Sequence, residues 1–224
     1  MKKGIFITAT GTDVGKTYIS ALILKHLLAL GLNVGYYKPA LSGAVRVGDK
    51  LVPGDCKFVL DFAGVSLDPQ KCLSYMFEEP VSPHLASQLE GVPIELPKIL
   101  SDFKDISSKY DYMIVEGAGG IVCPFNLGEN KLMIADVIKA LGLDIIVVAS
   151  ASLGTINSTV LTIDYARSQN INVRGVILNN YDEKDLMQRD NLLQIENLTG
   201  VKVIATVKNG QTDLSISPDV FKEI

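Results

Sequence analysis

The chain has 224 residues, of which 47% are hydrophobic and 21% are charged. This composition is typical of a globular protein and excludes a wholly disordered chain. A total of 21 Lys and Arg residues against 25 Asp and Glu residues gives a formal net charge of −4. A mildly acidic chain disfavours broad electrostatic binding to nucleic acid. We expect one domain over residues 1–224.

The start of the chain and its cysteines indicate a cytoplasmic protein. Met1, Lys2 and Lys3 resemble the charged start of a signal peptide, but the apolar stretch that follows is too short. The apolar run at residues 145–149 is far below the roughly 20 residues that span a bilayer. Three widely spaced cysteines without a CxxC pair predict buried thiols rather than a disulfide framework or a zinc site.

Short apolar runs alternate with helical patterns along the chain. The runs are rich in β-branched residues, as expected for strands that are covered on both faces. The alternation predicts an α/β fold with a mainly parallel sheet flanked by helices, in which ligands bind beyond the carboxyl ends of the strands. The predicted strands are residues 4–8, 34–37, 112–116, 144–149, 174–178 and 202–206. The predicted helices are residues 16–30, 96–107, 133–141, 155–169 and 183–198, and residues 40–64 are expected to form a loop region that leads into a short helix from Cys56.

The first predicted strand is followed by TGTDVGKT at residues 10–17. A Gly-Lys-Thr tail that opens a helix directly after a strand is the context of a phosphate-binding P-loop. In such loops the lysine, here Lys16, reaches the β- and γ-phosphates, and the Thr17 hydroxyl binds Mg²⁺. Thr10 stands where the usual first glycine would be, so we expect Gly11 to supply the unusual backbone torsion. The alternative is a plain strand–turn–helix that happens to contain a lysine.

Two carboxylates are candidate Mg²⁺ ligands. Glu116 ends a buried strand and precedes a glycine-rich turn, which is where a nucleotide-bound metal finds a protein ligand. Asp55 follows Pro53-Gly54 at the start of the short helix. The alternatives are a solvated acid for Glu116 and a helix N-cap for Asp55.

Further polar residues follow other predicted strands. Lys38 comes directly after the second strand and is placed to hold an anionic group, although a surface lysine is the simpler interpretation. Residues 150–157 form a small-residue turn into a helix, which is either a second anion site or a plain capped helix. Asn179 lies where a nucleobase commonly binds in such folds, and a turn-forming role is equally simple.

Together these segments resemble the dethiobiotin synthetase family over most of the chain. The P-loop is shared with many NTPases, whereas the combination of the other motifs is far more specific. The matching segments are TGTDVGKT (10–17), GYYKPALSG (35–43), GD (54–55), EPVSPH (79–84), VEGAGG (115–120) and LGTIN (153–157). The loop at residues 205–210 lacks the proline that this family commonly carries in its base-binding turn.

The resemblance implies an ATP- and Mg²⁺-dependent ligase of biotin biosynthesis. Its substrates would be 7,8-diaminopelargonic acid and CO₂, and its products dethiobiotin, ADP and phosphate. In the family mechanism a carbamate on one amine attacks the γ-phosphate of ATP, and the second amine then displaces phosphate and closes the ureido ring. This chemistry requires positioning and charge stabilisation rather than a protein nucleophile.

The resemblance also implies roles for individual residues. Lys16, Lys38 and Thr12 would be catalytic, and Thr17, Asp55 and Glu116 would hold Mg²⁺. Nucleotide binding would involve Asp13, Val14, Gly15, Lys16, Thr17, Tyr18, Glu116 and Asn179, with Asn179 facing adenine. Substrate binding would involve Thr12, Lys38, Ser42, Leu153, Gly154 and Asn157, with the substrate carboxylate received by the residue 152–157 turn across a homodimer interface.

Three rival functions share the P-loop. A corrinoid-type amidoligase usually carries an appended glutaminase domain, for which 224 residues leave no room. A partitioning or positioning ATPase has a signature lysine where this chain has Gly11, and membrane-acting versions end in a basic amphipathic helix that residues 217–224 do not resemble. A general phosphate-binding module leaves Lys38 and Glu116 without a role.

Overall fold

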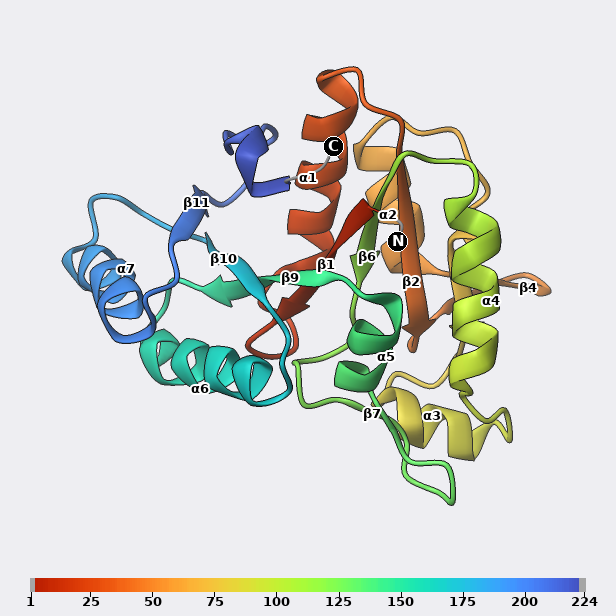
Figure 1. Cartoon of the computed structure of the whole chain (residues 1–224). Helices are drawn as coiled ribbons and strands as arrows, with labels where there is room; N and C mark the ends of the chain where they lie inside the picture. The colour runs from red at the N-terminus through yellow and green to blue at the C-terminus, as the bar shows by residue number, and fades with distance from the viewer. Residues whose placement is uncertain (1–2, 222–224) are drawn as a thin grey trace.

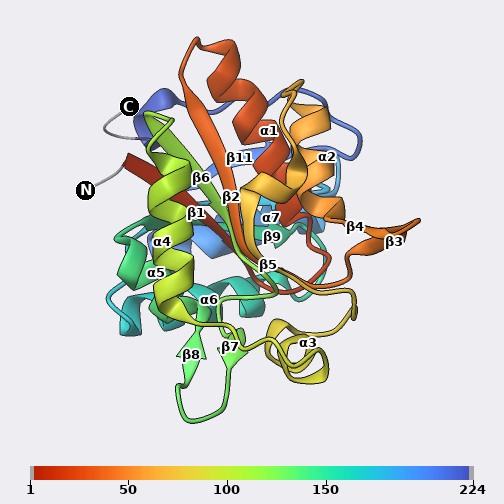
Figure 2. The ribbon, with the colours of Figure 1, turned by 90° about the vertical axis from the view of Figure 1, so that its right-hand side faces the viewer.

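The computed structural model describes residues 3–221, in which seven parallel strands form a single sheet with helices on both faces (Figures 1 and 2). The strands in spatial order are β11 (Val203–Val207), β10 (Val173–Asn179), β9 (Asp144–Ser150), β1 (Lys3–Ala9), β6 (Tyr112–Glu116), β2 (Val34–Leu41) and β5 (Leu73–Met76). This arrangement confirms the predicted α/β fold with its mainly parallel sheet.

The sheet is buried on both sides because its strands carry apolar residues at consecutive positions. Ile5 and Ile7 belong to one apolar cluster, whereas Phe6 between them belongs to the cluster on the opposite face. The first cluster lies under α1 (Lys16–Ala29) and α2 (Gly54–Phe62). The opposite face is covered by α4 (Leu96–Ser107), α5 (Ile134–Leu141) and α6 (Thr155–Ser168), and α7 (Leu186–Thr199) packs beside α6 (Figures 1 and 2).

The expectation of a strand at residues 34–37 followed by a loop was wrong in its extent. Strand β2 continues to Leu41, so Lys38 lies inside it. The first half of β2 pairs with β6 as far as Tyr37, and its second half pairs with β5 from Lys38 onward. Pro39 therefore follows the point where pairing with β6 ends, and its missing N–H removes no bond from that ladder.

Residues 40–64 are also more regular than expected. After β2 they form a hairpin of β3 (Val45–Val47) and β4 (Lys50–Val52), and α2 then begins at Gly54 rather than at Cys56. The remaining elements are α3 (Pro83–Leu89), the short hairpin of β7 (Pro124–Asn126) and β8 (Leu132–Met133), and 3-10 helices at Pro69–Cys72 and Pro218–Phe221.

All three cysteines are free and buried, as predicted. Among residues 3–221, none of the helices combines the length and apolar character needed to cross a bilayer. Met1 and Lys2, and the last three residues of the tail at 217–224, lie outside the described residues.

Candidate functional site

The phosphate loop connects β1 to α1 at the carboxyl edge of the sheet. Asp13 and Gly15 have positive φ angles of 59° and 98°, so the sharp turns fall at these two residues. The expectation that Gly11 supplies the unusual torsion was wrong, because its φ lies outside the left-handed region. Instead, the Gly11 carbonyl accepts a hydrogen bond from the Lys16 ammonium at 3.0 Å, which closes the loop on itself.

Lys16 opens α1 and is buried. Its pKa is lowered, chiefly by burial and next by repulsion from Lys38. Among residues 3–221, no carboxylate forms a salt bridge with it. Gly15, the N-cap residue of α1, has no side chain with which to cap the first-turn N–H groups of the helix. A buried ammonium next to a helix N-terminus without a side-chain cap is suited to bind an anion.

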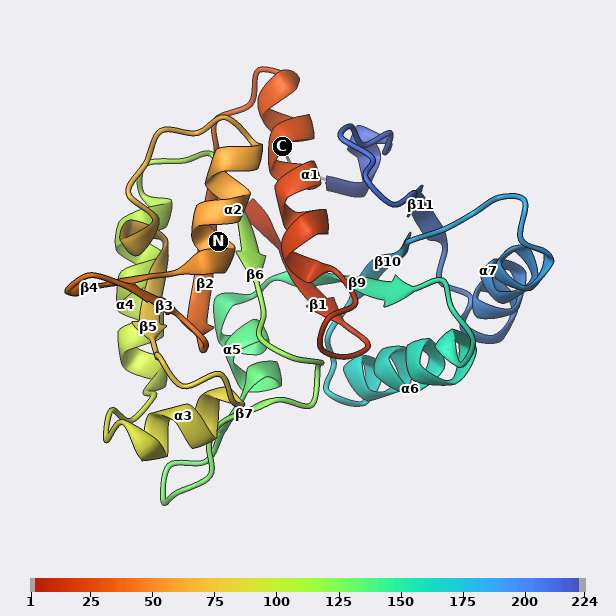
Figure 3. The same cartoon turned by 180° about the vertical axis from the view of Figure 1, so that it is seen from behind.

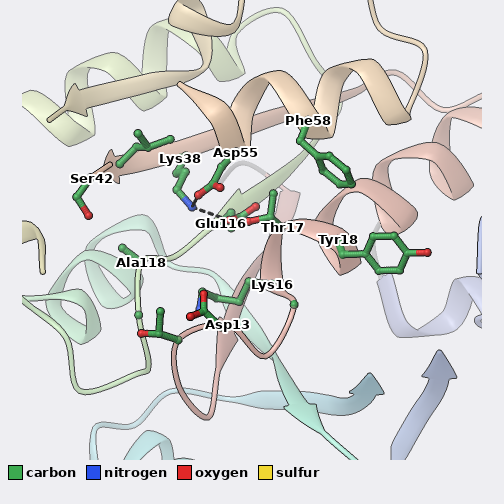
Figure 4. A pocket seen from close by; sticks show the side chains of 14 residues that line it. Asp13, Lys16, Thr17, Tyr18, Lys38, Ser42, Asp55, Phe58, Glu116 and Ala118 are labelled. Atoms are coloured by element: carbon green, nitrogen blue, oxygen red, sulfur yellow. Dashed lines mark hydrogen bonds and ion pairs between the residues drawn. The ribbon is translucent and has the colours of Figure 1, made fainter. Parts of the chain in front are cut away.

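Glu116 is the centre of a buried polar network (Figure 4). Its side chain is fully buried, and it accepts hydrogen bonds from the hydroxyls of Thr17 at 2.8 Å and Tyr36 at 2.9 Å. The Lys38 ammonium lies 2.5 Å from Glu116 Oε1 and 2.8 Å from Asp55 Oδ2. The alternative of a solvated acid is therefore wrong for Glu116.

Strand geometry explains how Lys38 reaches both acids. Tyr36 and Lys38 are two residues apart and project to the face that α1 and α2 cover, while Glu116 ends the neighbouring strand β6. The Lys38 side chain is only 4% exposed, so it is not a surface lysine. Burial alone lowers the pKa of Lys38, but the attraction of Glu116 and Asp55 outweighs it, and the net shift is upward.

Asp55 lies in the first turn of α2 and does not cap it. The N-cap residue is Pro53, and the Asp55 carboxylate is directed to Lys38 instead. With Glu116 and the Thr17 hydroxyl, Asp55 provides a set of hard oxygen donors, and the two carboxylates already flank the Lys38 ammonium. Among residues 3–221, groups of three or more His, Cys, Asp or Glu side chains that would form a conventional metal centre are absent.

These groups line a pocket of about 630 Å³. Of the residues that the sequence predicted for the site, ten lie on its wall: Thr12, Asp13, Gly15, Lys16, Thr17, Tyr18, Lys38, Ser42, Asp55 and Glu116. The wall is completed by four residues that were not predicted as site residues, although three of them lie in the matching segments at 35–43 and 115–120: Leu41, Phe58, Ala118 and Gly119.

Tyr36 was also missed, although it holds Glu116 directly. Burial raises its pKa, and the neighbouring Glu116 raises it further, so the phenol stays protonated and donates. Residues two apart in a strand share a face, so Tyr36 would have been indicated if the second strand had been predicted to include Lys38. Residues three apart on a helix lie on the same face, so Phe58 is expected on the face of α2 that carries Asp55.

The remaining predicted residues lie outside this pocket. Asn179 ends β10 and is buried against the back of the phosphate loop, where its Nδ2 donates to the Val14 carbonyl at 3.0 Å. Its Oδ1 is buried and without a hydrogen-bond partner among residues 3–221. Leu153 and Gly154 are exposed at the start of α6, and Asn157 lines a second hollow with Thr10, Gly11 and Gly120. The loop after β1 and the helix α6 both follow strands of the central sheet (Figures 1 and 3), and Thr10 and Gly11 of that loop share this hollow with α6.

Comparison with known proteins is consistent with this geometry. A family model described as an AAA domain matches residues 3–213. An ATP-dependent dethiobiotin synthetase BioD of Clostridium botulinum (strain Alaska E43 / Type E3) is 49% identical over 203 residues, which cover 91% of this chain and 89% of that protein. The protein of the same name from Clostridium perfringens (strain 13 / Type A) is 48% identical over 92% of this chain and 91% of its own.

The chain belongs to the dethiobiotin synthetase family. More distant proteins of known structure share the fold of this chain. A ParA family ATPase from Chlorobium tepidum TLS matches with a TM-score of 0.55 at 17% identity, over 94% of this chain and 86% of its own. The MinD cell division protein of Aquifex aeolicus matches with a TM-score of 0.53 at 16% identity, over 92% and 82%. At such identities these two likenesses show a shared fold only.

The contact between Gly15 and Asn179 yields a prediction about loop stability. A Cβ atom on Gly15 would lie 2.1 Å from Asn179 Nδ2, and a φ of 98° is itself unfavourable for alanine. We expect Gly15→Ala to reduce the free energy of unfolding by at least the roughly 1–3 kcal/mol of such backbone strain, measured by chemical denaturation. Gly11→Ala is the matched control, because its Cβ would meet nothing within 4 Å. Equal stability of the two variants would contradict the prediction.

Proposed function

We propose that this chain is an ATP-dependent dethiobiotin synthetase, a ligase that forms two C–N bonds. Its substrates would be 7,8-diaminopelargonic acid, CO₂ and ATP, and its products dethiobiotin, ADP and phosphate. The observation that carries the proposal is the position of Lys38. Its buried ammonium contacts both Asp55 and Glu116 in the pocket that the phosphate loop also lines, where a carbamate and a γ-phosphate would meet.

In the proposed reaction, an amine nitrogen of the substrate adds to CO₂ and loses a proton to give a carbamate. A carbamate oxygen attacks the γ-phosphorus of ATP, and the bond to ADP breaks. The second amine attacks the carbamoyl carbon, the ring closes and phosphate leaves. Lys16 would bind the phosphates from the loop, Lys38 would balance charge on the carbamate and the transferring phosphoryl group, and Thr12 and Ser42 would orient the reacting end of the substrate.

We propose that Thr17, Asp55 and Glu116 hold Mg²⁺. Their oxygen atoms match the ligands this ion prefers, and the two carboxylates already gather around the Lys38 ammonium. When bound, the ion would neutralise charge on the phosphates. Because Lys38 contacts both carboxylates, its ammonium and the ion compete for the same oxygens. If the ion displaces Lys38 from the two carboxylates, the positive charge of the Lys38 ammonium would be directed toward the substrate.

We also propose a homodimer in which each subunit completes the site of the other. Three apolar side chains support this interface: Val122 is 59%, Leu153 is 85% and Leu161 is 60% exposed. Val122 and Leu161 line the same hollow as Asn157, which adjoins the phosphate loop. Leu153, Gly154 and Asn157 of one subunit would then receive the substrate carboxylate at the site of its partner. Asn179, whose Oδ1 has no hydrogen-bond partner among residues 3–221, is proposed to face adenine. The buried free thiols suit a cytoplasmic protein.

The first test of the proposed function is the substrate dependence of ADP formation. We expect ADP and phosphate to appear only when 7,8-diaminopelargonic acid and bicarbonate are both present, because the carbamate is the nucleophile. A coupled assay for ADP, with dethiobiotin measured by mass spectrometry, follows both products. ADP release at full rate without the diamine would contradict the synthetase function and favour a nucleotide-switched ATPase.

A second test addresses the competition between Lys38 and the metal ion. We expect Lys38→Gln to bind Mn²⁺ in the absence of nucleotide at least tenfold more tightly than the native chain, since both carboxylates lose their cation. Electron paramagnetic resonance of free Mn²⁺ measures this affinity. The same variant should lose ADP formation. It should also unfold at a lower temperature than the native chain, and added Mn²⁺ should raise the unfolding temperature of the variant. Lys16→Gln is the control, because Lys16 contacts neither acid, and a parallel gain in that variant would refute the competition.

A third test concerns the dimer. We expect Leu161→Asp to give a monomer, because a charge would be buried at the apolar interface. Analytical ultracentrifugation measures the mass in solution. Leu89→Asp is the matched control, since Leu89 is a similarly exposed leucine on α3 that lies outside both hollows. A native chain that is monomeric, or an unaffected Leu161→Asp dimer, would contradict this interface.

A further inference from the structure

The two oxygens of the Glu116 carboxylate have different surroundings. Oε1 accepts hydrogen bonds from the Thr17 hydroxyl and the Lys38 ammonium, and both of these residues line the main pocket. Oε2 accepts a hydrogen bond from the Tyr36 hydroxyl at 2.9 Å. Tyr36 is itself buried in the apolar cluster under α1 and α2. Glu116 thus directs one oxygen to the groups of the pocket and the other to the interior of the protein.

Strand pairing explains how Glu116 is connected to its neighbours. On one side, β1 pairs with β6 as far as Glu116. On the other side, the pairing of β2 with β6 ends at Val115, one residue earlier. The Glu116 carboxylate is therefore connected to β2 through side chains, namely the Tyr36 hydroxyl and the Lys38 ammonium. The orientation of the carboxylate relative to β2 depends on these two contacts.

The two contacts differ in how they respond to a bound cation. Lys38 touches both proposed metal-binding carboxylates, so its ammonium competes with the ion for their oxygens. The Tyr36 hydroxyl is neutral and contacts Oε2, whereas Lys38 and Thr17 contact Oε1. A cation at Oε1 therefore leaves the hydrogen bond from Tyr36 in place. Once Lys38 has left the carboxylates, Tyr36 remains as the contact between β2 and the Glu116 carboxylate.

Burial makes this hydrogen bond important for the position of Oε1. A buried acceptor that loses its donor keeps the full cost of its desolvation. Without the phenol, the Glu116 carboxylate would turn toward its remaining donors, and Oε1 would move with it. Hydrogen bonds from outer partners orient the carboxylates that bind metal ions, and their removal typically weakens metal binding about tenfold to a hundredfold.

We infer that Tyr36 is a positioning residue that holds Glu116 in its metal-binding orientation when Lys38 is displaced. This inference rests on the proposed Mg²⁺ site of Thr17, Asp55 and Glu116. Tyr36 acts through Glu116 and touches neither the ion nor the substrate. Its ring fills the core in every state of the site, whereas its hydroxyl matters most when the metal ion is bound.

Metal affinity measured separately from nucleotide affinity tests the role of the hydroxyl. We expect Tyr36→Phe to weaken Mn²⁺ binding to the full-length chain with ADP about tenfold to a hundredfold, measured by electron paramagnetic resonance of free Mn²⁺. ADP affinity in the presence of a chelator, measured by titration calorimetry, should change less than twofold. In the ADP-release assay, the Mg²⁺ concentration for half-maximal rate should rise by the same factor as the Mn²⁺ dissociation constant.

Tyr37→Phe is the matched control, because Tyr37 is the next residue on the same strand and faces the other side of the sheet. Its hydroxyl contacts the Ser74 hydroxyl and the Ile99 carbonyl. This variant also loses a buried phenol hydroxyl and should also unfold at a lower temperature. Its Mn²⁺ affinity should stay within twofold of that of the native chain, because the lost hydroxyl has no contact with the metal site.

A double variant shows whether Tyr36 acts on the ion or only on Lys38. In the absence of nucleotide, we expect Tyr36→Phe combined with Lys38→Gln to bind Mn²⁺ about tenfold or more weakly than Lys38→Gln alone. If the loss disappears in the Lys38→Gln background, Tyr36 acts by placing Lys38, and the inference is wrong.

Two other results would overturn the inference. Native Mn²⁺ affinity in Tyr36→Phe would show that the hydroxyl does not position Glu116 for the ion. Equal losses in Tyr36→Phe and Tyr37→Phe, or an equal loss of metal-free ADP binding, would show a general effect on the fold. These binding measurements do not use the diamine, so their failure is distinct from failure of the synthetase function, which the diamine dependence of ADP release decides.

Discussion

The buried carboxylate of Glu116 is the constraint on which the site depends. A fully buried charge is tolerated only when it is paired and hydrogen-bonded, and loss of its partner costs about 3–5 kcal/mol. Glu116 meets this requirement with Thr17 of α1 and with Tyr36 and Lys38 of β2. Lys38 in turn holds Asp55 of α2. One carboxylate thus ties the phosphate loop, two strands and two helices into a fixed arrangement.

This network also holds the phosphate loop in a defined arrangement. The loop is closed by Lys16 on the Gly11 carbonyl and supported by Asn179 on the Val14 carbonyl, so its backbone is held at both points. Pre-organised donors of this kind stabilise developing charge without a reorganisation cost at the moment of reaction. The pocket combines these fixed ionic groups with the exposed ring of Phe58.

Most of the fold was predictable because the strands are buried on both faces and therefore appear as apolar runs. The strand β5 and the β3–β4 hairpin were not predicted, since each segment has four residues or fewer and lacks a clear period. The end of β2 was misplaced because Pro39 resembles a terminator, whereas the sheet accommodates it where pairing passes from β6 to β5. The turn residues of the phosphate loop were also misassigned. The positive φ angle was expected at Gly11 because glycine adopts it most easily, but Asp13 adopts it instead.

The sequence by itself determined the phosphate loop, the acid at the end of β6 and the family, because each depends on residue types at short, fixed spacing. Only the tertiary structure decided that Lys38 is buried between Asp55 and Glu116, that Tyr36 holds Glu116, and that Phe58 reaches the pocket. These contacts join segments that are distant along the chain. Their existence depends on strand register and on the packing of α2, which no local pattern specifies.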